Sequence, residues 1–190
     1  MTGRITLKPN HKRLLSLTIS AALCGLIGAP ATALAADSEE SLTTTIDSIS
    51  TGNTPSGIAI NSATDTLFVT NADDNNVSII DGINNSVIDT VSVGEMPLGI
   101  ALNSGKTLAY TANFSSGNVS VIDTATNTVV DTIETGGSPT QVAVTPDDSQ
   151  VFVTDAQHDG IHIIDTATGQ TRDITINVPT EGIAISPDGQ

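Results

Sequence analysis

The sequence predicts an all-β protein built from tandem units of 42 residues, and three observations support this prediction. First, Asn76–Pro97 and Asn118–Pro139 match at 11 of 22 positions without a gap. Second, Phe68, Tyr110 and Phe152 occupy one phase of the same period, which is the sign of a true repeat. Third, each unit holds four short runs rich in β-branched residues, separated by Gly, Asn, Asp, Pro or Ser, as strands and turns are.

Four strands in about 42 residues are typical of a β-propeller blade rather than of a sandwich or a β-helix. In the unit that begins at Pro97, the four runs are residues 99–102, 108–113, 119–123 and 129–133. Runs such as Ile58–Ile60 and Leu67–Val69 are apolar at successive positions, so both faces of each sheet need cover. Blades stacked face to face around an axis provide that cover.

The position of each run within a blade follows from its residue types. Gly57 and Gly99 open the first strand, where we expect the strands nearest the axis to leave no room for a side chain. The fourth run is the most polar, as the outer rim of a blade should be. Connections from one blade to the next carry prolines that fix φ, at Pro55, Pro97 and Pro139.

An aspartate ends the third strand of each unit, at Asp81, Asp123 and Asp165. An Asp side chain can accept a hydrogen bond from a backbone N–H two residues further on, which closes an Asx turn. We therefore assign these three carboxylates to turn formation and not to catalysis.

The N-terminal 35 residues predict a secretory signal peptide. A basic start is followed by the apolar run Leu14–Ala29 and by Ala33–Ala35, after which we expect cleavage, with residues 36–42 as a short linker. An uncleaved N-terminal anchor is the alternative. Cys24, the sole cysteine, lies inside this leader, so the mature chain would have no thiol, no disulfide and no site for covalent haem. The predicted location is secreted, periplasmic or cell-surface, without membrane insertion after cleavage.

Removal of the leader would leave a strongly acidic chain. Lys106 and Arg172 would remain against 21 acidic residues, a formal charge of 2 − 21 = −19. Such a chain repels nucleic acid, whose binding requires Lys and Arg to neutralise phosphates. The charge also disfavours anionic lipid. The partner is expected to be a protein or a cell-envelope ligand.

Several motifs resemble the YVTN family of β-propeller repeats, found in secreted and cell-surface proteins of bacteria and archaea. They are FVTN at Phe68–Asn71, the long run Val119–Ile133, P-x-G-I-A at Pro55–Ala59, and SPDG at Ser186–Gly189. The resemblance extends from about Thr43 to the end of the chain. The third unit departs from it, because Gln141 replaces the glycine of the first strand. Gly182 then follows after 41 residues instead of 42.

The resemblance implies a propeller that closes with seven blades, which would need roughly 294 residues against the 190 − 35 = 155 after the leader. We therefore expect residues 43–190 to form a partial propeller, an open arc of about three blades and a fragment of a longer chain. The predicted parts are blades 55–92, 97–134 and 139–176, an N-terminal outer strand 43–50 and a C-terminal inner strand 182–186.

Function is expected in the loops between the fourth and first strands and between the second and third strands, because these loops differ most among the units. The favoured hypothesis is a non-catalytic recognition or scaffold protein. The alternative is a propeller enzyme, similar to those that hydrolyse lactones or hold a redox centre. No catalytic residue and no cofactor are predicted. The residues expected on the recognition face are Asp73, Asp74, Glu95, Phe114, Glu134 and His158.

No metal site is predicted either, although Asp73, Asp155, His158 and Asp159 are candidates for one. Asp73 lies in a stretch that resembles a calcium loop but lacks the glycine pivot and the distal Glu. His158 and His162 are four residues apart, and in a loop followed by a strand this spacing is not expected to place the two rings together.

Overall fold

The computed structural model of the protein describes residues 48–158 and 160–189, all within the compact unit Thr45–Gln190. The predicted signal peptide, the linker and residues 43–47 of the predicted outer strand lie outside the described residues. Residues 48–50, the remainder of that predicted strand, have no regular secondary structure. Among the described residues, no helix is long and apolar enough to cross a membrane.

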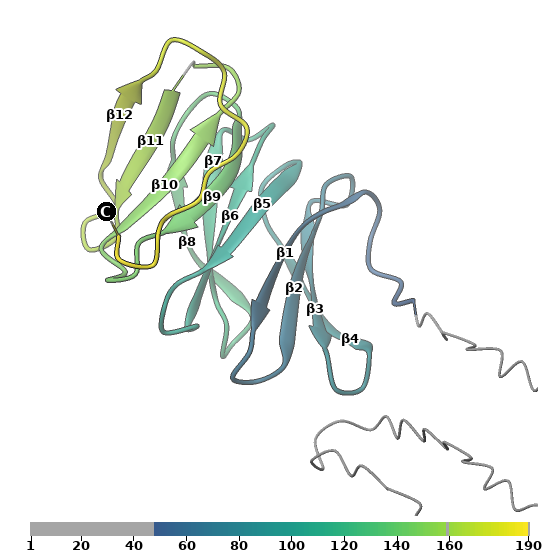
Figure 1. Ribbon diagram of the computed structural model, residues 1–190. Helices are drawn as coiled ribbons and strands as arrows, with labels where there is room; N and C mark the ends of the chain where they lie inside the picture. Colours follow the sequence, from purple (N-terminus) through teal and green to yellow (C-terminus); the bar gives the residue numbers. More distant parts are fainter. Residues whose placement is uncertain (1–47, 159, 190) are drawn as a thin grey trace, which may run out of the picture. The chain divides into compact units, whose positions relative to one another are not determined.

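Twelve strands form three antiparallel sheets of four strands each, and within each sheet the strands lie side by side in chain order (Figure 1). The first sheet consists of β1 (Pro55–Asn61), β2 (Thr66–Asn71), β3 (Asn76–Asp81) and β4 (Ser86–Ser92). The second consists of β5 (Pro97–Leu102), β6 (Leu108–Asn113), β7 (Asn118–Asp123) and β8 (Thr128–Glu134). The third consists of β9 (Pro139–Val144), β10 (Gln150–Asp155), β11 (Gly160–Asp165) and β12 (Thr171–Thr175). These sheets confirm the predicted all-β class and its four-stranded blades.

The strand nearest the axis is the first of each sheet, because β5 lies between β1 and β9. Gly99 of β5 shows how close this approach is. A Cβ added there would stand 2.7 Å from both the Cα of Gln141 and the carbonyl oxygen of Thr140 in β9. The predicted absence of room for a side chain on the first strand is therefore confirmed at this position.

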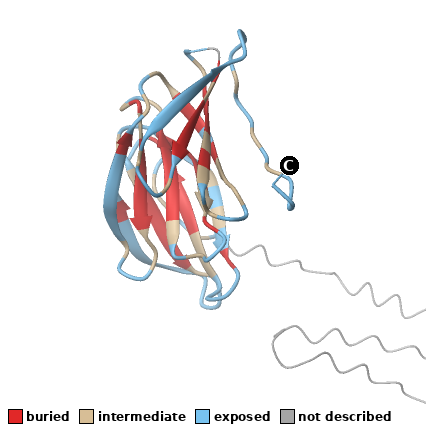
Figure 2. Cartoon of the chain, turned by 90° about the vertical axis from the view of Figure 1, so that its left-hand side faces the viewer, coloured by how far each residue is buried: buried red, intermediate tan, exposed pale blue. Residues whose placement is uncertain are grey.

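Two apolar cores fill the spaces between neighbouring sheets. The core between the first and second sheets includes Phe68, Ile79 and Ile122, and the core between the second and third sheets includes Tyr110 and Val119. The second sheet thus contributes apolar side chains to both of its faces, as the unbroken apolar runs predict. Figure 2 shows the buried residues in the middle of the sheets and the exposed ones on the loops and the outermost strands.

The fourth strands carry the exposed rim. In β4 and β8 all residues but one are exposed, and in β12 every described residue is exposed. The outward face of β1 is also open to solvent, with Ile58 58% and Ile60 55% exposed.

The turns after the third strands have the predicted hydrogen bonds. In each sheet, one carboxylate oxygen of the strand-ending aspartate accepts the backbone N–H groups two and three residues further on. These bonds favour the charged form, so the pKa of Asp81, Asp123 and Asp165 lies below its ordinary value.

The third sheet differs from the other two in register. A β-bulge interrupts the pairing of β3 with β4 and of β7 with β8, whereas β11 and β12 pair without interruption. A bulge adds one residue to a strand. Its absence from the third sheet accounts for the 41-residue step that separates Gln141 from Gly182.

The predicted inner strand 182–186 is wrong, because these residues have no strand structure. A strand requires a hydrogen-bonded neighbour, and the part of the chain that the structure describes contains no strand beside this segment. The residues just before it are nevertheless anchored, since the hydroxyl of Thr180 donates to the carbonyl oxygen of Gly160 at 2.6 Å.

Candidate functional site

The loops that were expected to carry function lie together at one end of the sheets. We call this end the loop face, defined by residues 51–56, 71–76, 93–98, 113–118 and 135–140, together with 155–158 and 160. In each sheet a backbone hydrogen bond of 3.0 Å ties the two kinds of loop together: Ala72 to Thr54, Phe114 to Met96, and Ala156 to Ser138. The loop face is therefore a hydrogen-bonded surface carried by the strands.

Most of the predicted recognition residues are accessible on this face. Asp73, Asp74, Glu95, Glu134 and His158 are exposed, and Phe114 is half-buried. Two of the carboxylates also hold the loops. Asp74 accepts the backbone N–H and the side-chain amide of Asn53, and Asp73 accepts the hydroxyl of Thr54. These bonds lower the pKa of Asp74. Asp73 is not part of a group of potential metal ligands among the described residues.

A cluster of titratable side chains forms on the third sheet. Asp155 ends β10, His158 lies in the turn that follows, and His162 is the third residue of β11. One potential ligand atom from each residue can be chosen so that all three atoms lie within 4.8 Å of one another. Two of these residues, Asp155 and His158, were candidates from the sequence. The placement of Asp159, another candidate, lies outside the described residues.

The two histidine rings do come together, with centroids 6.4 Å apart, so the expectation that their spacing would separate them is wrong. The reason is the hairpin. Asp155 pairs with Gly160 and Val153 pairs with His162, so the side chains of Asp155 and His162 are diagonal neighbours on one face. The tight turn then folds His158 back onto Asp155, whose Oδ1 accepts the backbone N–H of His158 at 3.0 Å.

Asp173 of β12 completes the row, and its participation was not predicted. It lies directly opposite His162 because β11 and β12 pair without a bulge. In the other two sheets, the aspartates 42 and 84 residues earlier, Asp131 and Asp89, pair instead with Val121 and Ile79. The shortened step at the end of the third unit was a signal of this change, but the sequence did not show which strand pair it affected.

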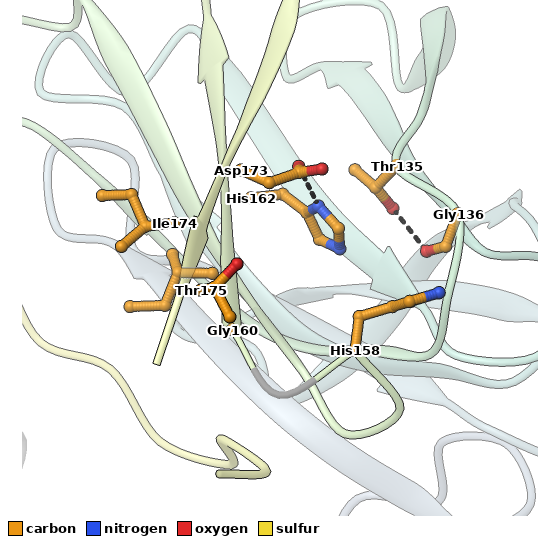
Figure 3. Close-up of a pocket in the computed structure, with 9 residues that line it drawn as sticks. Thr135, Gly136, His158, Gly160, His162, Asp173, Ile174 and Thr175 are labelled. Carbon is orange, nitrogen blue, oxygen red and sulfur yellow. Dashed lines mark hydrogen bonds and ion pairs between the residues drawn. The ribbon is translucent and has the colours of Figure 1, made fainter. Parts of the chain in front are cut away.

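Hydrogen bonds connect the four side chains of the cluster (Figure 3 shows His158, His162 and Asp173). His162 Nε2 lies 2.8 Å from Asp155 Oδ2, and His162 Nδ1 lies 2.7 Å from Asp173 Oδ1. His158 Nδ1 lies 3.1 Å from Asp155 Oδ2. The other oxygen, Asp155 Oδ1, accepts three backbone N–H groups, from Ser138, Gln157 and His158.

Burial and hydrogen bonding act in opposite directions on the two buried members. Burial raises the pKa of Asp155, but the bonds from His162 and from the backbone outweigh it, and the pKa falls well below its usual range. Burial lowers the pKa of His162, but the bonds and charges of Asp155 and Asp173 outweigh it, and the pKa rises. A buried carboxylate thus stays ionised beside a strongly basic imidazole.

The first two sheets have a neutral pair at the same positions. Asn71 and Ser78 in the first sheet correspond to Asp155 and His162, and the amide of Asn71 donates to the Ser78 hydroxyl at 2.9 Å. Asn113 and Ser120 make the same bond at 2.9 Å in the second sheet. The blade frame therefore needs only a small polar contact here, and the third blade has replaced it with an acid and an imidazole.

A shallow pocket of about 330 Å³ opens beside the cluster. It is lined by Thr135, Gly136, His158, His162 and Asp173, among others (Figure 3). Gly137 passes close over the same side chains with a φ of 62°. A Cβ at Gly137 would stand 1.8 Å from Asp155 Oδ2 and 2.2 Å from His158 Nδ1, so a side chain there is incompatible with the cluster.

Comparisons with known proteins agree with the propeller architecture. The protein family described as "Lactonase, 7-bladed beta-propeller" matches residues 30–182. Among solved structures, the chain is similar to hydrazine synthase of Kuenenia stuttgartiensis, with 25% identity and a TM-score of 0.69. That match covers 77% of this chain but 43% of the other, so the chain spans less than half the length of the solved structure. No curated protein matches the chain.

Proposed function

The chain belongs to the seven-bladed β-propeller lactonase family, and from this premise we propose that it is a secreted or cell-envelope propeller that recognises a ligand through its loop face. One observation carries the proposal. The strand frame repeats from blade to blade, whereas the side chains at equivalent positions of the loops change, as in Asp74, Ser116 and His158. A constant frame with variable loops suits recognition.

The charge of the loop face indicates the class of ligand. Asp73, Asp74, Glu95 and Glu134 expose carboxylates there. The cations Lys106 and Arg172 belong to the turn between β5 and β6 and to β12. An acidic surface attracts basic partners and repels anionic ones over about 8–10 Å at physiological ionic strength. The proposed ligand is therefore a basic segment of a protein of the cell envelope, bound without catalysis.

Binding of a Lys-rich peptide to the full-length chain tests this proposal, with a Glu-rich peptide of equal length as the control ligand. We expect saturable binding that weakens as salt is added. Glu95→Gln should weaken it, whereas Asp65→Asn, which removes one charge from the turn between β1 and β2 at the opposite end of the first sheet, should not. Equal loss in both variants would indicate attraction to the net charge and would refute a specific recognition face.

A second candidate function is lactone hydrolysis, and it is favoured by the family match alone. Proton release at constant pH from δ-gluconolactone and γ-butyrolactone measures ring opening directly. Turnover above the spontaneous rate that is lost on heat denaturation would support the enzyme. A rate equal to the protein-free control would leave the recognition function as the proposal.

Secretion is part of the proposal and has its own test. We expect the exported protein to begin at Ala36, because the predicted cleavage follows Ala35. Mass spectrometry of the N-terminal peptide from the envelope or the culture medium measures this. Recovery of the exported protein with the leader attached would contradict cleavage.

A further inference from the structure

We propose that Asp155, His158 and His162 form a binding site for a divalent transition-metal ion of the Zn²⁺ type. The proposal goes beyond ligand recognition by the loop face and does not depend on it. It rests on the geometry of the cluster, on the donor atoms it offers, and on the way the surrounding residues orient those atoms.

The spacing of the ligand atoms fits a small coordination sphere. Asp155 Oδ2 lies 2.8 Å from His162 Nε2 and 3.1 Å from His158 Nδ1, and all three atoms lie within 4.8 Å of one another. In a tetrahedral zinc site with ligands at about 2.0–2.1 Å, the ligand atoms are about 3.3 Å apart. Two edges need to widen by only a few tenths of an ångström, and His158 lies in a turn from which it can adjust.

The donor set favours a transition metal over calcium or magnesium. Two imidazole nitrogens and one carboxylate oxygen suit Zn²⁺ and the neighbouring divalent ions, whereas Ca²⁺ and Mg²⁺ prefer oxygen ligands throughout. Three protein ligands also leave one tetrahedral position free. Since His158 and His162 line the pocket, that position can be completed by water from the pocket.

The residues around the cluster aim its ligand atoms. Asp155 Oδ1 is occupied by three backbone N–H groups, which leaves Oδ2 as the oxygen that faces both histidines. Asp173 accepts the N–H of His162 Nδ1, which fixes the tautomer that presents Nε2 to an ion. The ion would take the place of the proton between Nε2 and Asp155, and that proton would pass to solvent.

A role in the frame alone does not account for the cluster. The Asn–Ser pairs of the first two blades satisfy the same positions with neutral groups. The third blade instead buries a charged Asp155, with no exposed surface, beside a nearly buried His162. In the same blade, Gly137 stands where the first two units have Asn53 and Glu95, which gives the cluster space. Several changes toward metal ligation thus coincide in one blade.

The test is calorimetric titration of the full-length chain with ZnCl₂ after treatment with a chelator. We expect one ion per chain. CoCl₂ provides the second readout, because the visible absorption of bound Co²⁺ reports a low-symmetry site with nitrogen ligands. The variant His158→Ser copies Ser116 of the second unit at an exposed position, so it should fold normally and lose at least tenfold in Zn²⁺ affinity.

A second variant separates metal binding from folding. Asp155→Asn combined with His162→Ser recreates the pair of the first two blades, and it should abolish Zn²⁺ binding while retaining the β-sheet circular dichroism. Asp73→Asn, outside the cluster, is the matched control and should bind Zn²⁺ as the parent does. The proposal is overturned if the parent binds no stoichiometric Zn²⁺ or Co²⁺, or if the two cluster variants bind as tightly as the parent.

Discussion

Asp173 Oδ1 lies 2.7 Å from His162 Nδ1, on the strand directly opposite, in the one sheet of the described residues whose third and fourth strands pair without a bulge. The bulge in the other two sheets shifts the corresponding aspartates to different partners. A local change of register has thus placed a carboxylate behind a buried imidazole.

This relationship predicts that Asp173 positions His162 without touching the ion. Asp173→Asn should weaken Zn²⁺ binding by about 10–100-fold, the usual effect of removing a carboxylate partner from a ligating histidine. The thermal midpoint of the metal-free protein should change little, because Asp173 is exposed. Calorimetry with ZnCl₂ and a melt in chelator measure the two effects separately. Asp131→Asn, the equivalent change in the second sheet, should leave Zn²⁺ binding unaltered.

The close approach of first strands predicts a strong effect of a single methyl group. Gly99→Ala would force a Cβ against the backbone of β9 and should destabilise the protein by about 1–3 kcal/mol. Gly182→Ala is the control, because it lies one repeat after Gln141 and a Cβ there meets no atom within 4 Å. Urea denaturation measures both. Equal stability of the two variants would show that the first strands have room to separate.

The cores between the sheets predict the cost of a cavity. Ile122 is fully buried between the first and second sheets, so Ile122→Ala should lower the free energy of unfolding by about 2–5 kcal/mol. Ile88, which is 57% exposed on β4, provides the matched control, and Ile88→Ala should have little effect. If both substitutions cost the same in urea denaturation, the sheets do not stack as described.

Much of this architecture could be predicted from the sequence because it depends on the repeat. The all-β class, the four strands per blade and the aspartate turns each follow from residues that recur every 42 positions. The segment 182–186 could not be predicted correctly, since a strand depends on a neighbour and not only on its own residue types.

The candidate site could be predicted only in part. Asp155 and His158 were candidates, but their combination with His162 depends on a diagonal contact across a hairpin, which is a matter of register. Asp173 depends on a missing bulge in a different strand pair. The sequence shows the loss of one residue, but spacing alone does not show where the chain absorbs it.

The acid stability of the protein should depend on its turn aspartates. Hydrogen bonds from Thr145 and Ser149 lower the pKa of Asp147 to about 2, compared with an ordinary value of 3.8. Because the folded-state pKa is depressed, the stabilisation is complete above about pH 3.8 and is lost as the pH falls from there toward 2. Asp81, Asp123 and Asp165 act in the same direction.

Urea denaturation at a series of pH values tests this dependence. The midpoint of the parent should fall steadily below about pH 4. Asp147→Asn, which cannot titrate, should be less stable than the parent at pH 7 but should approach it as the pH falls toward 2. A difference between the two proteins that is constant over this range would contradict a role for the ionised carboxylate.

The equivalence of the blades has a practical consequence for protein engineering. Because the second blade supplies the same backbone at the same positions, the cluster is a module that can be transplanted into it by Glu95→Gly, Asn113→Asp, Ser116→His, Ser120→His and Thr132→Asp. The last substitution uses Thr132, since the bulge places this residue, and not Asp131, across from Ser120. One chain would then carry the native cluster and a duplicate side by side, so that a designer could vary the copy and keep the original as an internal reference.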